Sequence, residues 1–263
     1  MPRFAANLSF LFTELPFLER FAAAADNGFT AVEFMFPYEW PATDLRALLD
    51  QHGLRLVLFN CAQGDWAAGE RGIVALPGRE AEFEAAIATA LDYADVLGNR
   101  LVHVMAGLDS ASANAATFIG NLQSGADMAA SSGVTLIIEP INTRDMPGYF
   151  LSRTAPALDI IAKCERPNVG LLFDLYHRHV MEGDVSAGLR AVRGVARHMQ
   201  IASPPDRGEP GVGELDFKAL LAEIDASGYQ GTIGLEYKPR AGTVAGLSWL
   251  NALGVELGSG RRT

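Results

Sequence analysis

The chain has 263 residues, of which 49% are hydrophobic and 20% are charged, a balance that indicates a large buried core rather than disorder. Its formal net charge of −10 opposes non-specific binding to nucleic acid, which needs a basic surface, and an anionic substrate would need local positive charge. No apolar run approaches the ~18 residues of a membrane span, and no signal peptide is apparent. Two cysteines give no disulfide framework, so we expect a cytoplasmic protein in a reducing compartment.

Short runs rich in β-forming residues alternate with longer segments of helical periodicity from one end of the chain to the other. Several of the short runs are apolar at consecutive positions, as expected for parallel strands that are covered on both faces. The predicted strands are residues 4–9, 31–36, 54–60, 101–105, 134–139, 169–174, 198–202 and 232–236.

The segments between these strands are predicted helices. One helix follows Asp216, a good N-cap residue, and another has apolar residues at helical spacing, at Phe83, Ile87, Leu91, Ala94 and Leu97. Glycines that would end helices stand before the next strand, at positions 28, 53, 98, 133 and 228. Eight strand–helix units in about 250 residues predict a single (β/α)8 TIM barrel over residues 1–263. The competing doubly wound sheet lacks a Gly-x-Gly-x-x-Gly motif after its first strand.

Four side chains with metal-ligand chemistry stand at the ends of the last four predicted strands: Glu139, Asp174, Gln200 and Glu236. They are separated by 35, 26 and 36 residues, about one strand–helix unit each, so they should converge on the C-terminal mouth of a parallel barrel. Three carboxylates and one amide oxygen form an oxygen-only set that suits Mg²⁺ or Mn²⁺ better than zinc. Without a cation the carboxylates would raise one another's pKa values, so we expect a bound divalent metal.

Other side chains are candidates for holding a small hydroxy or keto acid substrate. Arg207 lies in a segment rich in glycine and proline, where its guanidinium could neutralise a carboxylate. His177 follows Asp174 by three residues and could reach the site from the start of a loop. Two histidines on predicted strands, His103 and His198, could fill the barrel interior or support the site from beneath. The remaining substrate-binding candidates are Lys238, Arg71 and Trp66.

Two connections are long enough to predict a functional role. Residues 61–78 follow the third predicted strand and carry Trp66, whose ring could exclude water if this loop closed as a lid. The alternative for Trp66 is a surface-packing anchor. Residues 203–213 follow the seventh strand and carry Arg207, and Pro204 and Pro205 should limit the freedom of this substrate loop.

Several segments resemble hydroxypyruvate isomerases, which belong to the xylose isomerase-like TIM-barrel superfamily. They are Gly-Asp-Trp-Ala-Ala-Gly-Glu-Arg-Gly at 64–72, Pro-Gly-Arg-Glu at 77–80, Ile-Glu-Pro-Ile-Asn at 138–142, Asp-Leu-Tyr-His at 174–177, Arg-Gly-Glu-Pro-Gly-Val-Gly-Glu at 207–214 and Glu-Tyr-Lys-Pro at 236–239. The first of these is the most specific, and it points to hydroxypyruvate isomerase or its close relative 2-oxo-tetronate isomerase. The likeness runs over residues 4–249, nearly the whole chain.

The resemblance implies roles for particular residues. The family's matching glutamates, here Glu139 and Glu236, are metal ligands and the pair that transfers the proton, and the other two predicted ligands complete the metal site. Sugar epimerases of the superfamily hold substrate oxygens with a histidine and an arginine at positions that resemble His177 and Arg207. We therefore expect an isomerase that interconverts hydroxypyruvate and tartronate semialdehyde (2-hydroxy-3-oxopropanoate) by proton transfer through an ene-diolate. The alternatives are a 2-oxo-tetronate isomerase, a ketose 3-epimerase or a dehydratase on the same barrel.

The chain departs from the family after the seventh predicted strand. The family usually continues Gln-Ile-Ala-Asp with one proline before the arginine, whereas this chain has Ser203, two prolines and Asp206 before Arg207. The departure bears on substrate preference more than on reaction type. A DNA-processing barrel like endonuclease IV would need several histidines and a basic groove, and this acidic chain with few histidines lacks both. A catalytically silent binding barrel would not need Glu139 and Glu236, so the presence of both argues against it. The sequence leaves the oligomeric state open, a homo-oligomer included.

Overall fold

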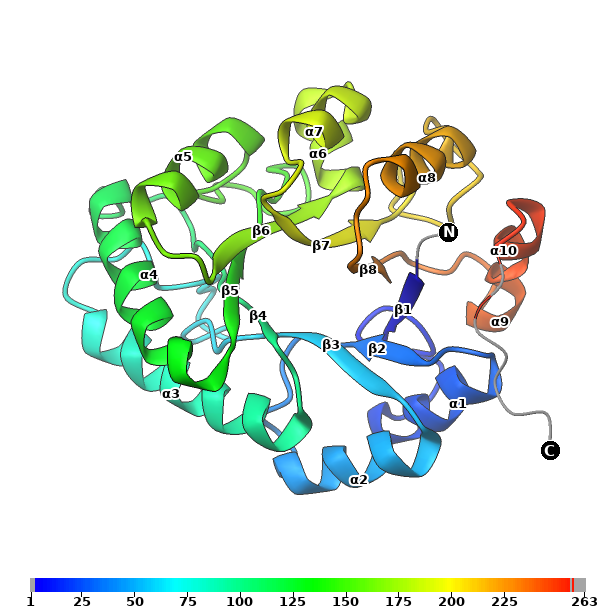
Figure 1. The fold of residues 1–263 in the computed structure, drawn as a ribbon, viewed down its shortest axis with the longest axis horizontal. Coiled ribbons are helices and arrows are strands. Elements are labelled where there is room, and N and C mark those ends of the chain that lie inside the picture. The colour runs from blue at the N-terminus through cyan, green and yellow to red at the C-terminus, as the bar shows by residue number, and fades with distance from the viewer. Residues whose placement is uncertain (1–2, 256, 258–263) are drawn as a thin grey trace.

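The computed structural model describes residues 3–255 and residue 257, which form a closed barrel of eight parallel strands in sequence order (Figure 1). The strands are β1 Arg3–Asn7, β2 Ala31–Glu33, β3 Arg55–Asn60, β4 Leu101–His103, β5 Thr135–Ile138, β6 Val169–Asp174, β7 Ala196–Ile201 and β8 Thr232–Leu235. Pairing of β8 with β1 closes the ring. The predicted (β/α)8 TIM barrel is confirmed, although several strands end one to three residues earlier than predicted.

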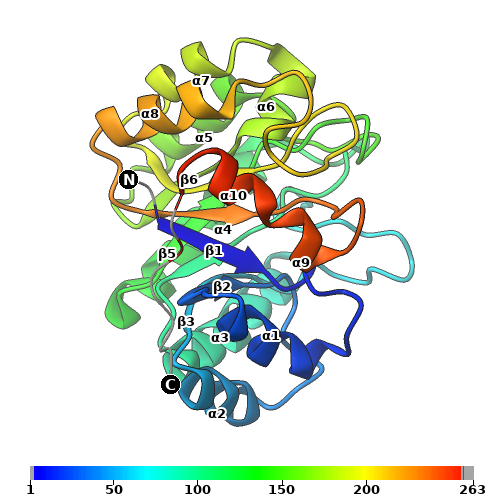
Figure 2. The same ribbon diagram turned by 90° about the vertical axis from the view of Figure 1, so that its right-hand side faces the viewer.

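Helices connect the strands and surround them on the outside (Figures 1 and 2). They are α1 Arg20–Asp26, α2 Ala42–His52, α3 Glu80–Leu97, α4 Ala115–Ala129, α5 Thr154–Cys164, α6 Leu175–Glu182, α7 Val185–Ala191, α8 Phe217–Ala226, α9 Thr243–Gly246 and α10 Ser248–Ala252, with the short 3-10 helices η1 Phe17–Glu19 and η2 Ala130–Ser132. The short helices α9 and α10 fill the place between α8 and α1 (Figure 1). Within the described residues, no helix combines the length and the apolar character that a membrane crossing needs.

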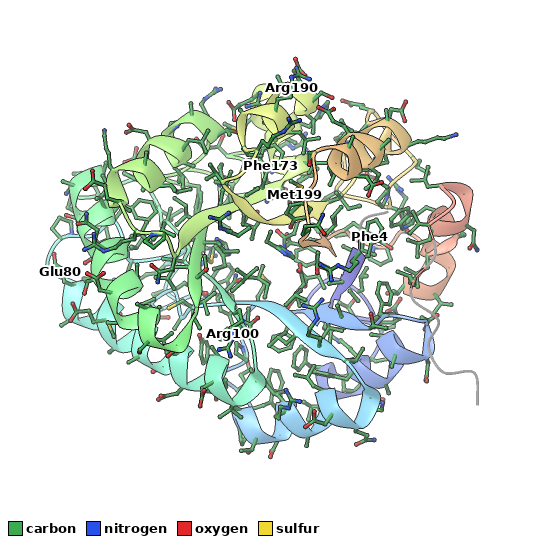
Figure 3. The ribbon with its side chains drawn as sticks, viewed as in Figure 1. Phe4, Glu80, Arg100, Phe173, Arg190 and Met199 are labelled. Atoms are coloured by element: carbon green, nitrogen blue, oxygen red, sulfur yellow. The ribbon has the colours of Figure 1, made fainter. Side chains whose placement is uncertain are left out.

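Two apolar clusters hold the barrel together. Successive residues of a strand face opposite sides, so β1, β2, β3, β5 and β6 contribute to both clusters. The larger cluster fills the space between strands and helices, where Phe173 of β6 and Met199 of β7 lie (Figure 3), and charged side chains such as Glu80 and Arg190 lie on the outer surface. The smaller cluster plugs the barrel interior with Ala5, Ala31, Val57, Leu58, Ile137 and Leu172.

Glycines end helices where the sequence predicts them. Gly53, Gly98 and Gly133 cap α2, α3 and η2 in the left-handed conformation, with φ of 64°, 70° and 63°. Glycine adopts this backbone conformation without the steric penalty of a Cβ atom. Each of these helices can therefore stop and turn at once into the next strand.

The barrel interior changes from apolar to polar towards the C-terminal ends of the strands. Polar residues on neighbouring strands stand in register there and are buried. The register pairs are Asn7 with Glu33, Asn60 with His103, and Asp174 with Gln200. We refer to these six residues and the equally buried His198 as the polar layer, which forms the floor of the candidate site.

Candidate active site

A cavity of about 230 Å³ opens above the polar layer, at the end of the barrel where the strands finish. Its polar lining includes Glu139, Gln200, Glu236, His177 and Arg207. Its apolar lining includes Phe10, Phe34, Met35, Met105, Ile141, Met146 and Trp66. Active sites of parallel barrels lie at this end because the loops that follow all the strands gather there.

Each of three carboxylates stands at the C-terminal end of a strand. Glu139 and Glu236 are the first residues after β5 and β8, and Asp174 is the last residue of β6. Asp174 also caps α6, because its Oδ1 accepts a hydrogen bond from the backbone N–H of Tyr176 at 2.7 Å. Its second oxygen, Oδ2, faces the site and lies 3.7 Å from Nε2 of His177. One carboxylate thus both starts a helix and contributes to the site.

Burial raises the pKa of all three carboxyl groups in the metal-free protein. It raises the pKa of Glu236 to about 8 and that of Asp174 to about 6, against the lowering effect of the Arg207 guanidinium on both. The pKa of Glu139 is raised well above its ordinary value by burial and then by the charges of Glu236 and Asp174. Such a group of buried carboxylates favours either bound protons or a bound cation.

Three oxygens of the cluster are buried without a hydrogen-bond partner: Oε1 of Glu139, Oδ2 of Asp174 and Oε1 of Gln200. A buried acceptor that stays unpaired costs about 1–3 kcal/mol, so three in one place suit a cation that all could ligate. Ligand atoms of Glu139, Asp174 and His177 lie within 4.8 Å of one another. This buried group could therefore hold a metal ion.

His177 reaches the site from the first turn of α6, not from a loop, because the helix begins directly after Asp174. Its Nδ1 lies 2.6 Å from the side-chain nitrogen of Asn142 and 3.4 Å from the backbone nitrogen of the same residue. A backbone N–H can only donate, so Nδ1 accepts, which favours a neutral ring with its proton on Nε2. Nη2 of Arg207 lies 3.5 Å from Nε2 and can also only donate, but this contact is longer than those to Asn142. Burial, and then the charge of Arg207, hold the pKa of His177 well below its ordinary value, which keeps the ring neutral.

Arg207 points from the loop after β7 into the carboxylate cluster. Its Nη2 lies 3.1 Å from Oε2 of Glu236 and 3.9 Å from Oδ2 of Asp174, and its Nη1 lies 3.8 Å from Oδ2 of Asp145. The guanidinium also lies over the ring of Phe10, 4.8 Å from its centroid. Among the described residues that line the cavity, Arg207 is the one permanently charged cation. An anion that enters the cavity would therefore meet this side chain.

Lys238, predicted to bind substrate, does not line the cavity in the described structure. Its side chain is exposed, although its backbone N–H donates to the carbonyl oxygen of Arg207 at 2.7 Å. Lys238 was a candidate because it stands two residues past Glu236, and residues two apart share a face only within a strand. Because β8 ends at Leu235, this rule no longer places Lys238 beside Glu236.

Trp66 does line the cavity, whereas Arg71 does not. The indole is 42% exposed and packs at a tilt against Phe36, with ring centroids 6.0 Å apart. Arg71 belongs to the same loop and stacks on the indole, with its guanidinium carbon 3.6 Å from the centroid of the Trp66 ring. Trp66 thus forms part of the cavity wall, and Arg71 stacks on its ring without lining the cavity.

The sequence reasoning missed Glu33, a buried carboxylate at the end of β2 that lines the same cavity. It accepts hydrogen bonds from Asn7, Gln200 and His198. His198 is therefore both inside the barrel and a supporting residue, the two positions that the sequence left open. An acidic residue within the apolar run at 31–34 was the available signal.

The residues that depart from the family pattern belong to a braced loop. Asp206 pairs with Arg240, from the segment after β8, through hydrogen bonds of 2.8 and 3.1 Å, and not with its neighbour Arg207. Arg240 also binds Glu209 through its backbone N–H at 2.7 Å and its guanidinium at 2.8 Å. The two acidic neighbours of Arg207 are thus held by a second arginine, which leaves Arg207 directed to the site.

Comparison with known proteins shows the family to which the chain belongs. Residues 21–253 match the family described as xylose isomerase-like TIM barrel. A 2-oxo-tetronate isomerase from Cupriavidus necator is 56% identical over 255 residues, which cover 95% of this chain and 98% of that protein. A hydroxypyruvate isomerase from Escherichia coli is 43% identical over 255 residues, which cover 95% of this chain and 99% of that protein.

A crystal structure from Brucella melitensis, described as an AP endonuclease of family 2, is 46% identical in sequence. It superposes with a TM-score of 0.93 over 96% of this chain and 99% of that chain. The resemblance inferred from the sequence motifs is therefore confirmed over nearly the whole chain. The chain belongs to the xylose isomerase-like TIM-barrel family, and it is an isomerase similar to the 2-oxo-tetronate and hydroxypyruvate isomerases.

Proposed function

We propose that this protein isomerises a short 2-keto acid that carries a hydroxyl group on carbon 3, moving the carbonyl from carbon 2 to carbon 3. The observation that carries the proposal is the cavity itself. Two buried glutamates with raised pKa, Glu139 and Glu236, lie there beside Arg207, the one permanent cation among the described lining residues. Moving a carbonyl requires that a proton leave one carbon and return to its neighbour. Carboxyl groups whose pKa is shifted towards neutrality suit both steps, and a guanidinium suits the acid's carboxylate.

The proposed metal ligands are Glu139, Asp174, Gln200 and Glu236, and the proposed metal is Mg²⁺ or Mn²⁺. The donor set consists of oxygens alone, and three of its atoms are buried without a partner. His177 belongs to the buried group that could hold a metal, but we do not propose it as a ligand, because the N–H groups of Asn142 that face Nδ1 favour a ring proton on Nε2. When bound, such a metal would acidify the C–H bond beside the carbonyl and stabilise the charge that develops on the substrate oxygens.

The side chains of the protein perform the remaining tasks. Glu139 and Glu236 stand at the ends of β5 and β8, which lie apart around the barrel mouth, so they can act on opposite sides of a substrate as base and acid. His177 donates its Nε2–H to a substrate oxygen, and Arg207 binds the carboxylate through its fork of N–H groups. Trp66, on the proposed lid at 61–78, limits the access of water to the ene-diolate.

The proposed substrates are 2-oxo-tetronate and hydroxypyruvate, and we expect 2-oxo-tetronate to be preferred. Both acids need the same shift of the carbonyl, which gives tartronate semialdehyde from hydroxypyruvate and a 3-oxo acid from 2-oxo-tetronate. The relative named for the four-carbon acid is 56% identical to this chain, against 43% for the one named for hydroxypyruvate. The reaction type is the same for both acids, so the experiment must compare kcat/KM for the three-carbon and the four-carbon acid.

The proposal can be tested with purified protein loaded with Mn²⁺ and incubated separately with each acid in D₂O. Proton NMR should show product from both acids, with deuterium at the reacting carbon and a higher kcat/KM for 2-oxo-tetronate. Treatment with EDTA should abolish turnover, and added Mn²⁺ should restore it. No turnover of either acid by protein that demonstrably contains metal would contradict the proposal, and a higher kcat/KM for a ketose such as D-fructose would replace it with a sugar 3-epimerase.

A nucleic-acid substrate has less support, although the structure from Brucella melitensis carries the description AP endonuclease. The chain has a formal net charge of −10, and the described lining of the cavity combines several carboxylates with one guanidinium. A phosphate backbone would be repelled by such a surface. We therefore propose a small organic acid, and not DNA, as the substrate.

A further inference from the structure

We propose that Glu33 is a positioning residue, which fixes the side-chain amide of Gln200 with its oxygen towards the carboxylate cluster, and that Gly234 provides the space for it. This inference rests on the proposed metal site, because Gln200 is one of the four proposed ligands. Glu33 is 1% exposed and stands at the end of β2, and the proposed reaction gives it no chemical step. A carboxylate buried so completely needs donors that offset the loss of water.

The Glu33 carboxylate accepts three hydrogen bonds, one from the neighbouring strand β1 and two across the barrel interior from β7. Its Oε1 accepts from Nδ2 of Asn7 at 3.0 Å and from Nε2 of Gln200 at 2.7 Å. Its Oε2 lies 2.6 Å from Nε2 of His198. Gln200 and His198 both belong to β7, so Glu33 connects β2 to β7 past β1 and β8, which lie between them in the ring. These contacts hold the carboxylate in one place at the centre of the polar layer.

This arrangement decides which end of the Gln200 amide faces the proposed metal. A glutamine amide can turn by half a rotation, which exchanges its oxygen and its NH₂ group, and its neighbours select between the two states. Because Nε2 donates to Glu33, the amide oxygen is directed elsewhere, and it is one of the three unpartnered oxygens of the cluster. The reverse state would set that oxygen against the carboxylate and turn N–H groups towards a cation. Glu33 thereby makes Gln200 an oxygen ligand.

Gly234 on β8 provides the room that this contact needs. It is paired with Gln200 in the sheet and does not have a positive φ, so backbone strain does not require glycine there. A Cβ atom at this position would lie 2.2 Å from Oε1 and 2.5 Å from Oε2 of Glu33. Glycine inside a strand weakens it and often marks the close approach of another group. Here the Glu33 carboxylate is that group.

The test is the Mn²⁺ affinity of the purified protein, measured by isothermal titration calorimetry and by the EPR signal of bound Mn²⁺. We expect Glu33→Leu to weaken binding by roughly tenfold or more, as when a group that orients a metal ligand is lost. Glu33→Gln keeps an acceptor oxygen for Gln200, so its affinity should stay within about threefold of the wild type. Unchanged affinity in Glu33→Leu overturns the proposal. Equal weakening in both variants also overturns it, because Glu33 would then act through its charge alone.

Gly234→Ala provides a second route to the same measurement if Glu33→Leu does not fold. Its methyl group would displace the carboxylate, so Mn²⁺ should bind roughly tenfold more weakly, and unchanged affinity would overturn the proposal. Combined with Glu33→Leu it should add no further loss, because both changes remove one contact. The control is Glu223→Gln, a partly buried carboxyl group of α8 that pairs with Arg190 and does not line the cavity, which should bind Mn²⁺ like the wild type.

The two proposals fail in different ways. A wild-type protein that binds no Mn²⁺ overturns the proposed metal site, and this inference with it. A wild-type protein that binds Mn²⁺ together with a Glu33→Leu variant that binds it equally well overturns only the role of Glu33.

Discussion

Asn142 places two nitrogens against Nδ1 of His177, its side-chain nitrogen at 2.6 Å and its backbone nitrogen at 3.4 Å. These two contacts favour a ring proton on Nε2, which is 3.7 Å from an oxygen of Glu139, 3.7 Å from one of Asp174 and 3.5 Å from Nη2 of Arg207. His177 lies where a metal ligand could lie, but its contacts with Asn142 favour Nε2 as a hydrogen-bond donor. Asn142, which favours this position of the ring proton, lies 35 positions earlier in the chain, in the loop after β5.

Replacing Asn142 by aspartate tests the role of that proton. We expect Asn142→Asp to lower kcat/KM by roughly tenfold or more, because the carboxylate accepts the proton of Nδ1 and leaves Nε2 without one. Steady-state kinetics and the ¹⁵N shifts of the His177 ring measure the two effects. His177→Ala sets the lower limit of activity for this change. Wild-type kcat/KM in a variant whose ring proton has moved to Nδ1 would show that His177 does not donate to the substrate.

Glu139→Gln and Glu236→Gln should each reduce kcat by at least about a hundredfold, because each removes a general acid or base. Metal content must be measured in the same samples, since both residues are also proposed ligands. Asp174→Asn is the matched control, because Asp174 is a proposed ligand without a part in proton transfer. Excess Mn²⁺ should restore more activity to it than to the glutamine variants. Near-normal kcat in either variant would remove that glutamate from the proposed pair.

Arg207→Ala should lower kcat/KM for a 2-keto acid by about 2 kcal/mol, roughly 30-fold, as for a lost charge-assisted hydrogen bond, with most of the change in KM. Mn²⁺ binding should not weaken, because the variant loses a cation that lies 3.1 Å from Glu236. Arg207→Lys keeps the charge without the planar fork and should be intermediate. Lys238→Ala, at an exposed position, should behave like the wild type. If Arg207→Ala keeps full kcat/KM, the anion is held elsewhere, and Arg71 is the next candidate.

Arg240→Met tests whether bracing of the substrate loop matters. The variant loses three side-chain hydrogen bonds to Asp206 and Glu209, so Arg207 should be less well placed, and KM should rise roughly three- to tenfold with little change in kcat. The control is Arg190→Met, an exposed arginine of α7 that pairs with Glu223 away from the site. The same KM in both variants would mean that the loop keeps its shape without Arg240.

Metal binding should strengthen as the pH rises. Burial raises the pKa of Glu236 to about 8 and that of Asp174 to about 6, so the metal-free site holds protons that a divalent cation must displace. For a carboxyl group whose pKa is raised by folding, stability is full below its ordinary pKa and is lost as the pH climbs through the raised value. The metal-free protein should therefore become less stable between about pH 4.5 and pH 8, and Mn²⁺ should offset that loss.

Thermal unfolding at several pH values, with and without Mn²⁺, measures this effect. The increase in Tm on adding metal should widen from about pH 6 to pH 8, and calorimetry in buffers of different ionisation enthalpy should detect released protons. A constant increase in Tm over this range would show that the carboxyl groups are already ionised without metal.

Much of this protein follows from local sequence alone. The eight strands and the helices between them could be predicted because strand and helix periodicity are properties of short segments. The convergence of four polar residues at one end of the barrel could also be predicted, because each stands at or near the C-terminal end of an apolar run. These residues are Glu139, Asp174, Gln200 and Glu236. Parallel strands that all leave the barrel at one end place such residues together regardless of side-chain detail.

Contacts between residues far apart in the sequence could not be predicted from the periodicity of short segments. Gln200 bonds to Glu33, 167 positions away, and nothing in the spacing of either residue announces the other. The same holds for the pairing of Asp206 with Arg240. Lys238 lies beyond the end of β8, where strand alternation does not predict which way a side chain points, and the structure leaves it exposed and outside the cavity lining. Local sequence patterns thus predict the barrel and the kinds of side chain at its mouth. Which atom each of these side chains presents depends on the folded chain, because hydrogen-bond partners are set by three-dimensional distances that local periodicity does not encode.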